Sequence, residues 1–290
     1  MRDYVILTDS ASDLPPELAA ELDVRVVPLS FELDGRHYDN GMEDLTQEQL
    51  YACLRRGSQI KTASVNPQRF VREMGEILQS GCDILCLSFS SALSGTYNAA
   101  VMAAQELEES GSEGRVVVVD TRCASMGQGL LTYLTVQKKR EGASLEEARL
   151  FAEEKKERLC HWFTVDDLRF LSRGGRITCG AALIGTVLQR KPVLDMDLEG
   201  RLIPQGTVEG RRAALTRLLR EMQERADEEP RNQTVFISHG DCEKDVAFLV
   251  GLLRVRLGVT DIRIGCLGPV VGSHAGPGTV ALFFLGRKRP

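Results

Sequence analysis

The sequence predicts an α/β protein of two domains: an N-terminal three-layer α/β/α domain with a mainly parallel sheet, and a C-terminal α+β domain. The length of 290 residues is sufficient for two hydrophobic cores. Strand-like and helix-like segments alternate in the first half, whereas hairpin-like pairs mix with long helices in the second. We therefore expect domains at 1–158 and 159–290, with the boundary uncertain by about ten residues.

Short apolar runs predict the strands of the first half, in chain order, at 5–8, 24–27, 83–89 and 115–120. The last of these is apolar throughout its centre, as expected of a strand buried on both faces of a parallel sheet. Within residues 31–38, an Asp-Gly pair predicts the turn of a hairpin.

Capping signals predict the helices of the first half. Pro15 supplies the first turn of a helix that ends near residue 22. Thr46 and Gln49 form a capping box for a helix that stops at Gly57. Further helices are expected at 67–80, at 97–109, from 125 onward, and at 144–158.

The second half begins with strand-like segments around turns and continues with two long helices. Strands are expected at 161–165, 193–197, 201–206, 234–239, 261–267 and 279–284, and helices at 209–229 and 242–257. Because no low-complexity linker separates the halves, we expect the two domains to pack together and leave a cleft between them.

Composition excludes several classes of function. The net charge of −5 gives no electrostatic footprint for nucleic acid, and we expect the basic end, 286–290, to be a solvated tail. The apolar run at 4–7 is too short for the core of a signal peptide, and no run approaches a membrane span. The 8 cysteines form no C-x-x-C pair. We therefore expect a cytoplasmic protein whose cysteines are reduced.

Polar or glycine-rich residues stand at four candidate points, 8–13, 61–62, 94–96 and 268–279. Ligands of α/β sheets bind beyond the carboxyl ends of strands, so each point is a candidate site. In the last of them, glycines and prolines surround a lone histidine, His274. Packing alone does not account for that composition, and we predict a functional role for His274.

The strand-to-helix turn at 90–97 is rich in small and hydroxyl-bearing residues. Such a turn offers hydroxyl donors and free N–H groups to an anion, but it can also serve only as a helix cap. A guanidinium suits an anionic ligand because it is always charged and can bond bidentately. The segment 170–177 supplies one, although a surface arginine at a turn explains it equally well.

Several catalytic templates are absent from the sequence. It contains no Walker-type phosphate loop, no complete dinucleotide fingerprint, no H-E-x-x-H pair and no G-x-S-x-G elbow. The 4 histidines are scattered without metal-ligand spacing. We therefore predict no metal site, and the residues give little support for catalysis by this chain alone.

The segments 8–14, 61–62, 90–97, 171–176, 191–192 and 274–278 together resemble the DegV family, in order and in spacing. Members of that family are similar to the fatty-acid-binding subunit of bacterial fatty acid kinase. The resemblance implies that one long-chain fatty acid lies in a buried pocket between the two domains. It also implies a partner, a separate ATP-dependent kinase subunit, which converts the presented carboxylate to an acyl-phosphate.

The same resemblance implies roles for individual residues. Thr62 and Ser94 match residues that hydrogen-bond the carboxylate. Arg173 and His274 match the arginine and histidine that assist around the head group and in phosphotransfer. The chain would then be a lipid-binding subunit and not itself an enzyme, with the fatty acid as ligand and with no cofactor or metal.

The sequence departs from the usual DegV pattern at three points. Ala-Ser-Val at 63–65 replaces the common Ser-Gln-Pro, Ala92 replaces a frequent glycine, and Asn98 replaces a usual glutamine. The hydroxyl groups are retained, so head-group binding is still expected. The preferred length and unsaturation of the acyl chain stay open.

Two other functions remain open. One is a hydrolase or acyltransferase in which Ser94 is the nucleophile and His274 the base. The other is a carrier of a different anionic lipid or small acid. Covalent labelling of the serine would favour the first, and the identity of a bound ligand would distinguish the second.

Overall fold

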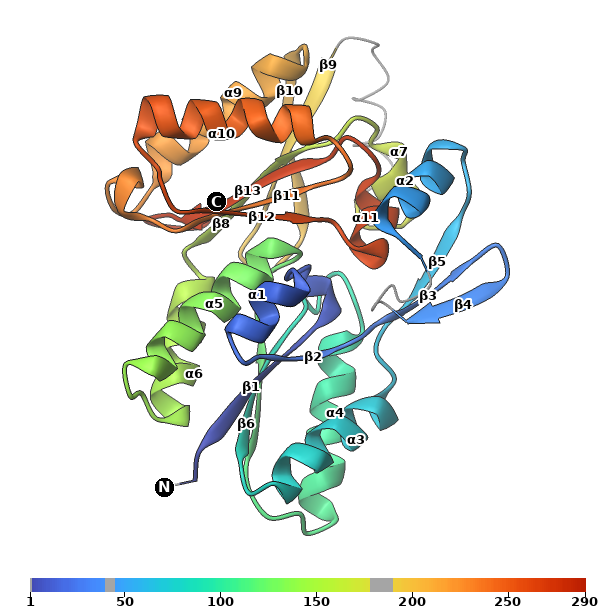
Figure 1. Ribbon diagram of the computed structural model, residues 1–290, viewed down its shortest axis with the longest axis vertical. Helices are drawn as coiled ribbons and strands as arrows, with labels where there is room; N and C mark the ends of the chain where they lie inside the picture. The colour runs from blue at the N-terminus through green and yellow to red at the C-terminus, as the bar shows by residue number, and fades with distance from the viewer. Residues whose placement is uncertain (1, 40–44, 178–189) are drawn as a thin grey trace.

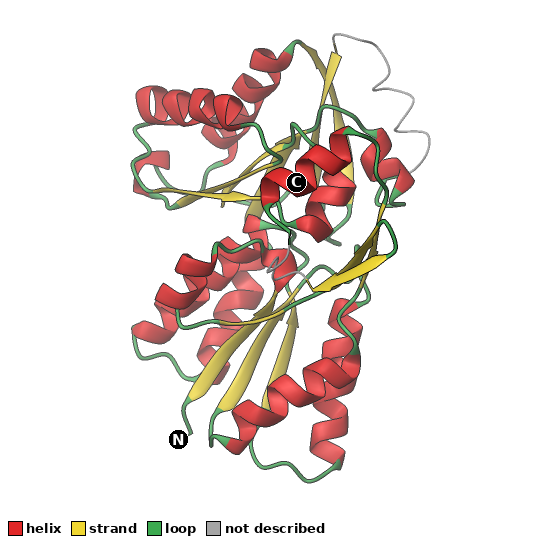
Figure 2. Ribbon diagram, turned by 45° about the vertical axis from the view of Figure 1, so that its right-hand side comes forward, coloured by secondary structure: helices red, strands yellow, loops and turns green. Residues whose placement is uncertain are grey.

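Four parallel strands form the sheet of the N-terminal half in the computed structural model, which describes residues 2–39, 45–177 and 190–290. In the order β2-β1-β6-β7, they are Arg25–Val27, Tyr4–Asp9, Asp83–Ser88 and Val116–Asp120. Figure 2 shows helices on both sides of these strands. The predicted α/β/α arrangement is therefore confirmed.

The two faces of this sheet bury different side chains because successive residues of a strand point in opposite directions. On β6, Ile84 and Cys86 pack with α3 (Pro67–Gln79) and α4 (Thr96–Glu109). Leu85 and Leu87 pack on the other side, against α1, α5 and α6. Those three helices span Pro16–Glu21, Met126–Arg140 and Leu145–Lys156.

A small antiparallel sheet extends from the N-terminal half toward the C-terminal half. Its strands, in the order β4-β3-β5, are Arg36–Asp39, Ser30–Leu33 and Ile60–Ala63. The predicted hairpin is confirmed, and both turn residues, Asp34 and Gly35, have positive φ angles of 51° and 80°. The predicted capping box also forms and begins α2 (Gln47–Arg55).

Helix α2 lies against the C-terminal half, beside α7 (Arg169–Arg173) and α11 (Pro269–Ala275), as Figure 1 shows. The buried hydroxyl of Tyr51 donates to the carbonyl of Leu267 at 2.9 Å. The small sheet and α2 therefore bring residues near position 62 to the C-terminal half of the chain.

The C-terminal half contains a mixed six-stranded sheet in the order β10-β9-β8-β13-β11-β12. In chain order, strands β8 to β13 span Leu159–Thr164, Arg190–Met196, Leu202–Glu209, Val235–His239, Ile262–Cys266 and Val280–Leu285. Only β11 and β12 pair in parallel among the described strands of this sheet. Helices α9 (Arg211–Arg225) and α10 (Glu243–Leu257) cover one face.

The other face of the six-stranded sheet turns toward the N-terminal half. Phe163, Phe236 and Phe283 share a core with residues of α5 such as Leu130. The chain passes from α6 to β8 between Lys156 and Leu159. The division into domains 1–158 and 159–290 stays a prediction.

Asp13 joins the two halves through buried hydrogen bonds. The Ser125 hydroxyl donates to one carboxyl oxygen at 2.6 Å, and the Gly268 N–H donates to the other at 3.0 Å. The hydroxyls of Ser125 and Ser238 lie 2.7 Å apart. Burial raises the pKa of Asp13 to about 7, despite these bonds, and burial also raises the pKa of Asp9 to about 6.

These raised pKa values predict a pH dependence of stability. The folded protein binds protons at these two carboxyls more tightly than the unfolded chain, so their contribution is present below about pH 4 and is lost as the pH rises through about 7. Asp13→Asn removes one such titration and suits the left-handed backbone at this position, where φ is 50°. We expect the free energy of unfolding of this variant to vary less between pH 5 and 8 than that of the wild type. One titrating proton changes the slope by at most about 1.4 kcal/mol per pH unit.

Urea unfolding at several pH values measures this slope. Asp34→Asn is the matched control because Asp34 is also left-handed but lies in the exposed hairpin turn. An unchanged slope in Asp13→Asn would contradict the prediction.

Candidate functional site

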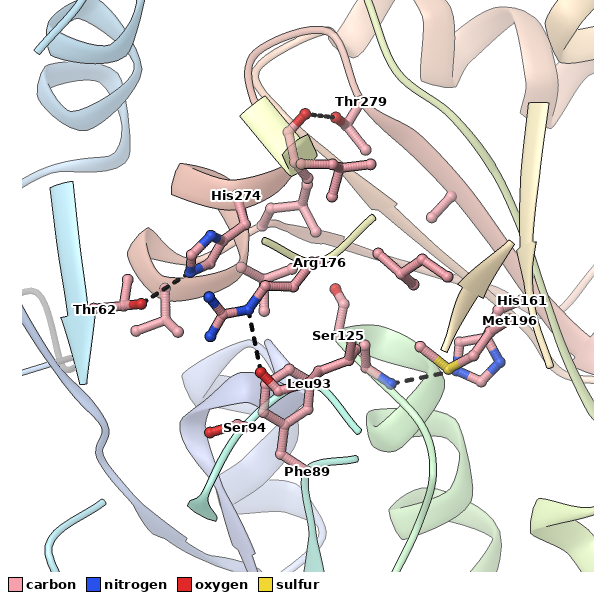
Figure 3. Close-up of a pocket in the computed structure, with 18 of the residues that line it drawn as sticks. Thr62, Phe89, Leu93, Ser94, Ser125, His161, Arg176, Met196, His274 and Thr279 are labelled. Atoms are coloured by element: carbon pink, nitrogen blue, oxygen red, sulfur yellow. Dashed lines mark hydrogen bonds between the residues drawn. The ribbon is translucent and has the colours of Figure 1, made fainter. Parts of the chain in front are cut away.

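One cavity lies between the two halves and has residues of both in its walls. Its volume is about 270 Å³. Apolar side chains make most of the lining, and they include Leu29, Phe89, Leu93, Phe163, Leu171, Met196, Leu202, Val270 and Phe283. Thr62, Ser94 and His274 gather on one side of this cavity in Figure 3. Three of the four residues singled out from the sequence therefore meet in one place.

Thr62 and His274 form a hydrogen bond across the two halves. Thr62 lies on β5, a strand that the sequence does not predict, and His274 lies near the end of α11. The Thr62 hydroxyl and Nε2 of His274 are 2.8 Å apart. On the other side of the ring, a Cβ added to Gly174 would lie 2.2 Å from Nδ1. The imidazole is thus held between β5 and the end of α7.

Close packing explains part of the glycine-rich stretch around His274. A Cβ on Gly272 would lie 2.6 Å from the hydroxyl of Tyr51. Gly276 combines a φ of 84° with a similar approach, 2.6 Å, to the ring of Phe170. Packing therefore accounts for these two glycines, because they let α11 approach α2 and α7.

His274 is neutral at ordinary pH. Burial, together with the positive charges of Arg176 and then Arg173, lowers the pKa of His274 to about 4. A neutral imidazole has one N–H group and one acceptor nitrogen. With the proton on Nε2, His274 donates to the oxygen of Thr62 and leaves the Thr62 hydroxyl hydrogen free to donate into the cavity.

Ser94 occupies the turn between β6 and α4, as expected. Its hydroxyl oxygen accepts from the N–H of Thr96 at 3.2 Å and lies 2.9 Å from the Thr96 hydroxyl. Gly95, the residue before the helix, has no side chain to cap the helix. The serine therefore caps the first turn of α4 and also lines the cavity. These are the two roles that the sequence leaves open for this turn.

The structure separates the two arginines of the 171–176 segment. The exposed Arg173 has its guanidinium carbon 4.9 Å from the centre of the Phe170 ring and is absent from the cavity lining. Arg176 lines the cavity and donates to the carbonyl of Leu93 at 3.2 Å. The resemblance assigns the assisting role to Arg173, whereas the arginine that lines the cavity is Arg176. The sequence indicates that a guanidinium lies near the site, but it does not indicate which of the two arginines lines the cavity.

The comparisons with known proteins agree with this architecture. The family described as "Uncharacterised protein, DegV family" matches residues 3–287. The chain belongs to the DegV family. A DegV domain-containing protein of Clostridium perfringens is 44% identical over 287 residues, which are 99% of this chain and 98% of that relative.

Two solved structures of similar proteins concern fatty acids. A DegV family protein from Thermus thermophilus, described for its fatty acid binding, is 34% identical, with a TM-score of 0.87 and coverage of 99% of this chain and 100% of that chain. A hypothetical protein from Thermotoga maritima, whose structure reveals a fatty acid binding function, is 28% identical, with a TM-score of 0.85 and the same coverage.

The described residues hold neither a metal cluster nor a membrane-spanning helix. No group of three or more His, Cys, Asp or Glu side chains in them is arranged to hold a metal ion. None of their helices is long and apolar enough to cross a membrane.

Proposed function

We propose that this DegV family protein binds one long-chain fatty acid in the cavity between its halves and presents the carboxylate to a separate ATP-dependent kinase subunit. The observation that carries the proposal is the division of the cavity into apolar walls and a polar side formed by Thr62, Ser94 and His274. A fatty acid likewise consists of an apolar acyl chain and a polar carboxylate. The fatty acid binding of the relatives from Thermus and Thermotoga supports this choice of ligand.

Burial of the acyl chain supplies most of the affinity. A tail of about fifteen methylenes gains roughly 12 kcal/mol, at about 0.8 kcal/mol for each buried CH₂. The loss of translational freedom and the ordering of the chain offset several kcal/mol of this gain. The remainder corresponds to a dissociation constant between micromolar and nanomolar.

The head group needs hydrogen-bond donors because a buried carboxylate without partners is costly. In the proposed complex, the hydroxyls of Thr62 and Ser94 donate to the carboxylate. His274 donates from Nε2 to the Thr62 oxygen and thereby orients the Thr62 hydroxyl. Arg176 adds a positive charge to the same cavity, so the carboxylate is bound without becoming protonated.

In the kinase step, an oxygen of the carboxylate attacks the γ-phosphorus of ATP. The bond from that phosphorus to the bridging oxygen of the β-phosphate breaks, and the products are an acyl-phosphate and ADP. The kinase subunit supplies the nucleotide, whereas this protein positions the carboxylate and keeps the tail from water. Because the step consumes ATP, we place the protein in the cytoplasm.

Arg173→Ala tests the kinase part of the proposal. Arg173 is exposed beside the polar side of the cavity, where it can contact the kinase subunit or its nucleotide. Loss of such a charge at an interface typically costs a few kcal/mol. We therefore expect acyl-phosphate formation to fall about tenfold or more while the dissociation constant of the fatty acid changes less than about twofold.

The experiment combines the fatty-acid-loaded protein with the ATP-binding subunit of a bacterial fatty acid kinase and traps the acyl-phosphate with hydroxylamine. Arg169→Ala is the matched control, since Arg169 is exposed on the same helix but is paired with Asp167. If binding and acyl-phosphate formation fall together, Arg173 is a head-group ligand. If the wild type forms no acyl-phosphate, the kinase proposal fails.

The hydrolase alternative fits the geometry less well. The Ser94 hydroxyl bonds Thr96, and Nε2 of His274 bonds Thr62, so no serine–histidine pair forms between these described residues. The lowered pKa of His274 also makes its imidazole a weak general base. Labelling of Ser94 by a fluorophosphonate, lost in His274→Ala, would restore this alternative.

A further inference from the structure

A buried histidine stands across the cavity from the head-group side. His161, on β8, lines the cavity and is only 2% exposed. Figure 3 shows it beside Met196, on the side of the cavity away from Thr62 and His274. Apolar side chains such as Phe163 and Leu202 line the same cavity.

The imidazole of His161 has little room to move. Its ring meets the ring of Phe283 edge to face, with 5.2 Å between centroids. A Cβ added to Gly127, in the first turn of α5, would lie 2.2 Å from Nε2. The ring is therefore packed directly on the backbone of α5.

The guanidinium of Arg289 contacts the same imidazole. The predicted solvated tail is wrong for this residue, because its side chain is folded back into the protein and is 1% exposed. Its Nε donates to the carbonyl of Leu159 at 2.9 Å, and one Nη lies 3.2 Å from both Nδ1 of His161 and Sγ of Cys123. None of the described carboxylates forms an ion pair with this guanidinium.

Two further polar groups contact the ring. The carbonyl of Leu159 lies 3.2 Å from Nδ1 of His161, and the N–H of Ala124 donates to Nε2 at 3.4 Å. Burial and the charge of Arg289 hold the pKa of His161 well below its usual range, so the ring is neutral. Rotation of the ring would break these polar contacts, at a cost that an apolar side chain would not incur.

We propose that His161, held by Arg289, is the floor of the acyl cavity and sets the longest fatty acid that the protein accepts. The inference rests on the proposed function and adds the determinant of chain length. A methionine or leucine in this place could change rotamer to admit further methylenes. A fixed imidazole cannot, so the affinity falls sharply once the methyl end of the chain reaches it.

The test offers the delipidated protein an equimolar mixture of saturated fatty acids of increasing length and identifies the retained acids by mass spectrometry. The main variant, H161A/R289M, removes both the floor and the cation behind it. We expect its longest retained acid to be longer than that of the wild type, with a gain of about fourfold in affinity for each additional buried methylene. R289M alone should broaden the upper limit, because the ring then loses one of the polar contacts that hold it.

Gly127→Ala should have the opposite effect on the longest retained acid, and alanine is compatible with helix α5. Its Cβ pushes the imidazole into the cavity, so the longest retained acid should become shorter. Trp162→Phe is the control, because Trp162 is the next residue on β8 but packs on the other face of the sheet. It should leave the length profile unchanged.

The outcomes separate this inference from the proposed function. If the wild type retains no fatty acid, the proposed function fails. If fatty acids are retained but Gly127→Ala and H161A/R289M both keep the wild-type length profile, the role of His161 is overturned. If only R289M matches the wild type, the holding role of Arg289 is overturned.

Discussion

Ser94→Ala and Thr62→Val are each expected to weaken the binding of palmitate by about 10- to 100-fold, because each removes a donor to a buried carboxylate, and such a bond contributes about 1.5–3 kcal/mol. Valine retains the shape of threonine, so the packing of β5 is preserved. Isothermal titration calorimetry with palmitate measures the effect.

Two comparisons make this result specific to the head group. Ser91→Ala is the matched control, since Ser91 lies in the same turn but its hydroxyl bonds Asp120 at 2.5 Å and does not line the cavity. The methyl ester of palmitate should bind the wild type and Ser94→Ala with similar affinity, because the ester has no charge to satisfy. Unchanged palmitate affinity in both Ser94→Ala and Thr62→Val would remove these residues from the site.

Gly174→Ala is expected to reduce palmitate affinity about tenfold without touching the ligand itself, since a lost charge-assisted bond has roughly that effect. The new Cβ would lie 2.2 Å from Nδ1 of His274, so the imidazole must move. This movement breaks the 2.8 Å contact with Thr62 and releases the hydroxyl that it orients. Calorimetry and thermal unfolding, measured together, separate loss of binding from loss of stability.

Gly251→Ala is the control for this substitution. A Cβ at Gly251, within α10, would meet no atom within 4 Å, so this variant should be more stable by up to about 1 kcal/mol and should bind normally. Wild-type affinity in Gly174→Ala would show that the position of His274 does not matter for binding.

The repeating elements of the fold were predictable because burial imposes a regular pattern on them. The capping box of α2 and the apolar run at Val116–Asp120 both mark their elements correctly. That strand is nevertheless not buried on both faces as expected, because it is the edge strand of its sheet and only Val119 is fully buried. The elements that carry the site were harder to predict. Strand β5, which positions Thr62, has only four residues with alternating partial exposure, and its partner strand lies far earlier in the chain.

Helix α11 shows a second reason for the missed elements. Pro269 at its first turn is a helix-start signal, but no helix is expected from the surrounding glycines. Those glycines are required by neighbours that are remote in sequence, such as Tyr51. The roles of His161 and Arg289 also depend on residues remote in sequence. No local pattern shows that His161 borders a cavity or that Arg289 contacts it.

Native mass spectrometry of the purified protein tests the central claim most directly, because it weighs the intact complex and its released ligand. We predict one long-chain fatty acid per chain, recovered on organic extraction, and its loss in the Ser94→Ala/Thr62→Val double variant but not in Ser91→Ala. A protein that carries no fatty acid and binds no added palmitate or oleate, or one that carries a different anionic lipid, would contradict the account.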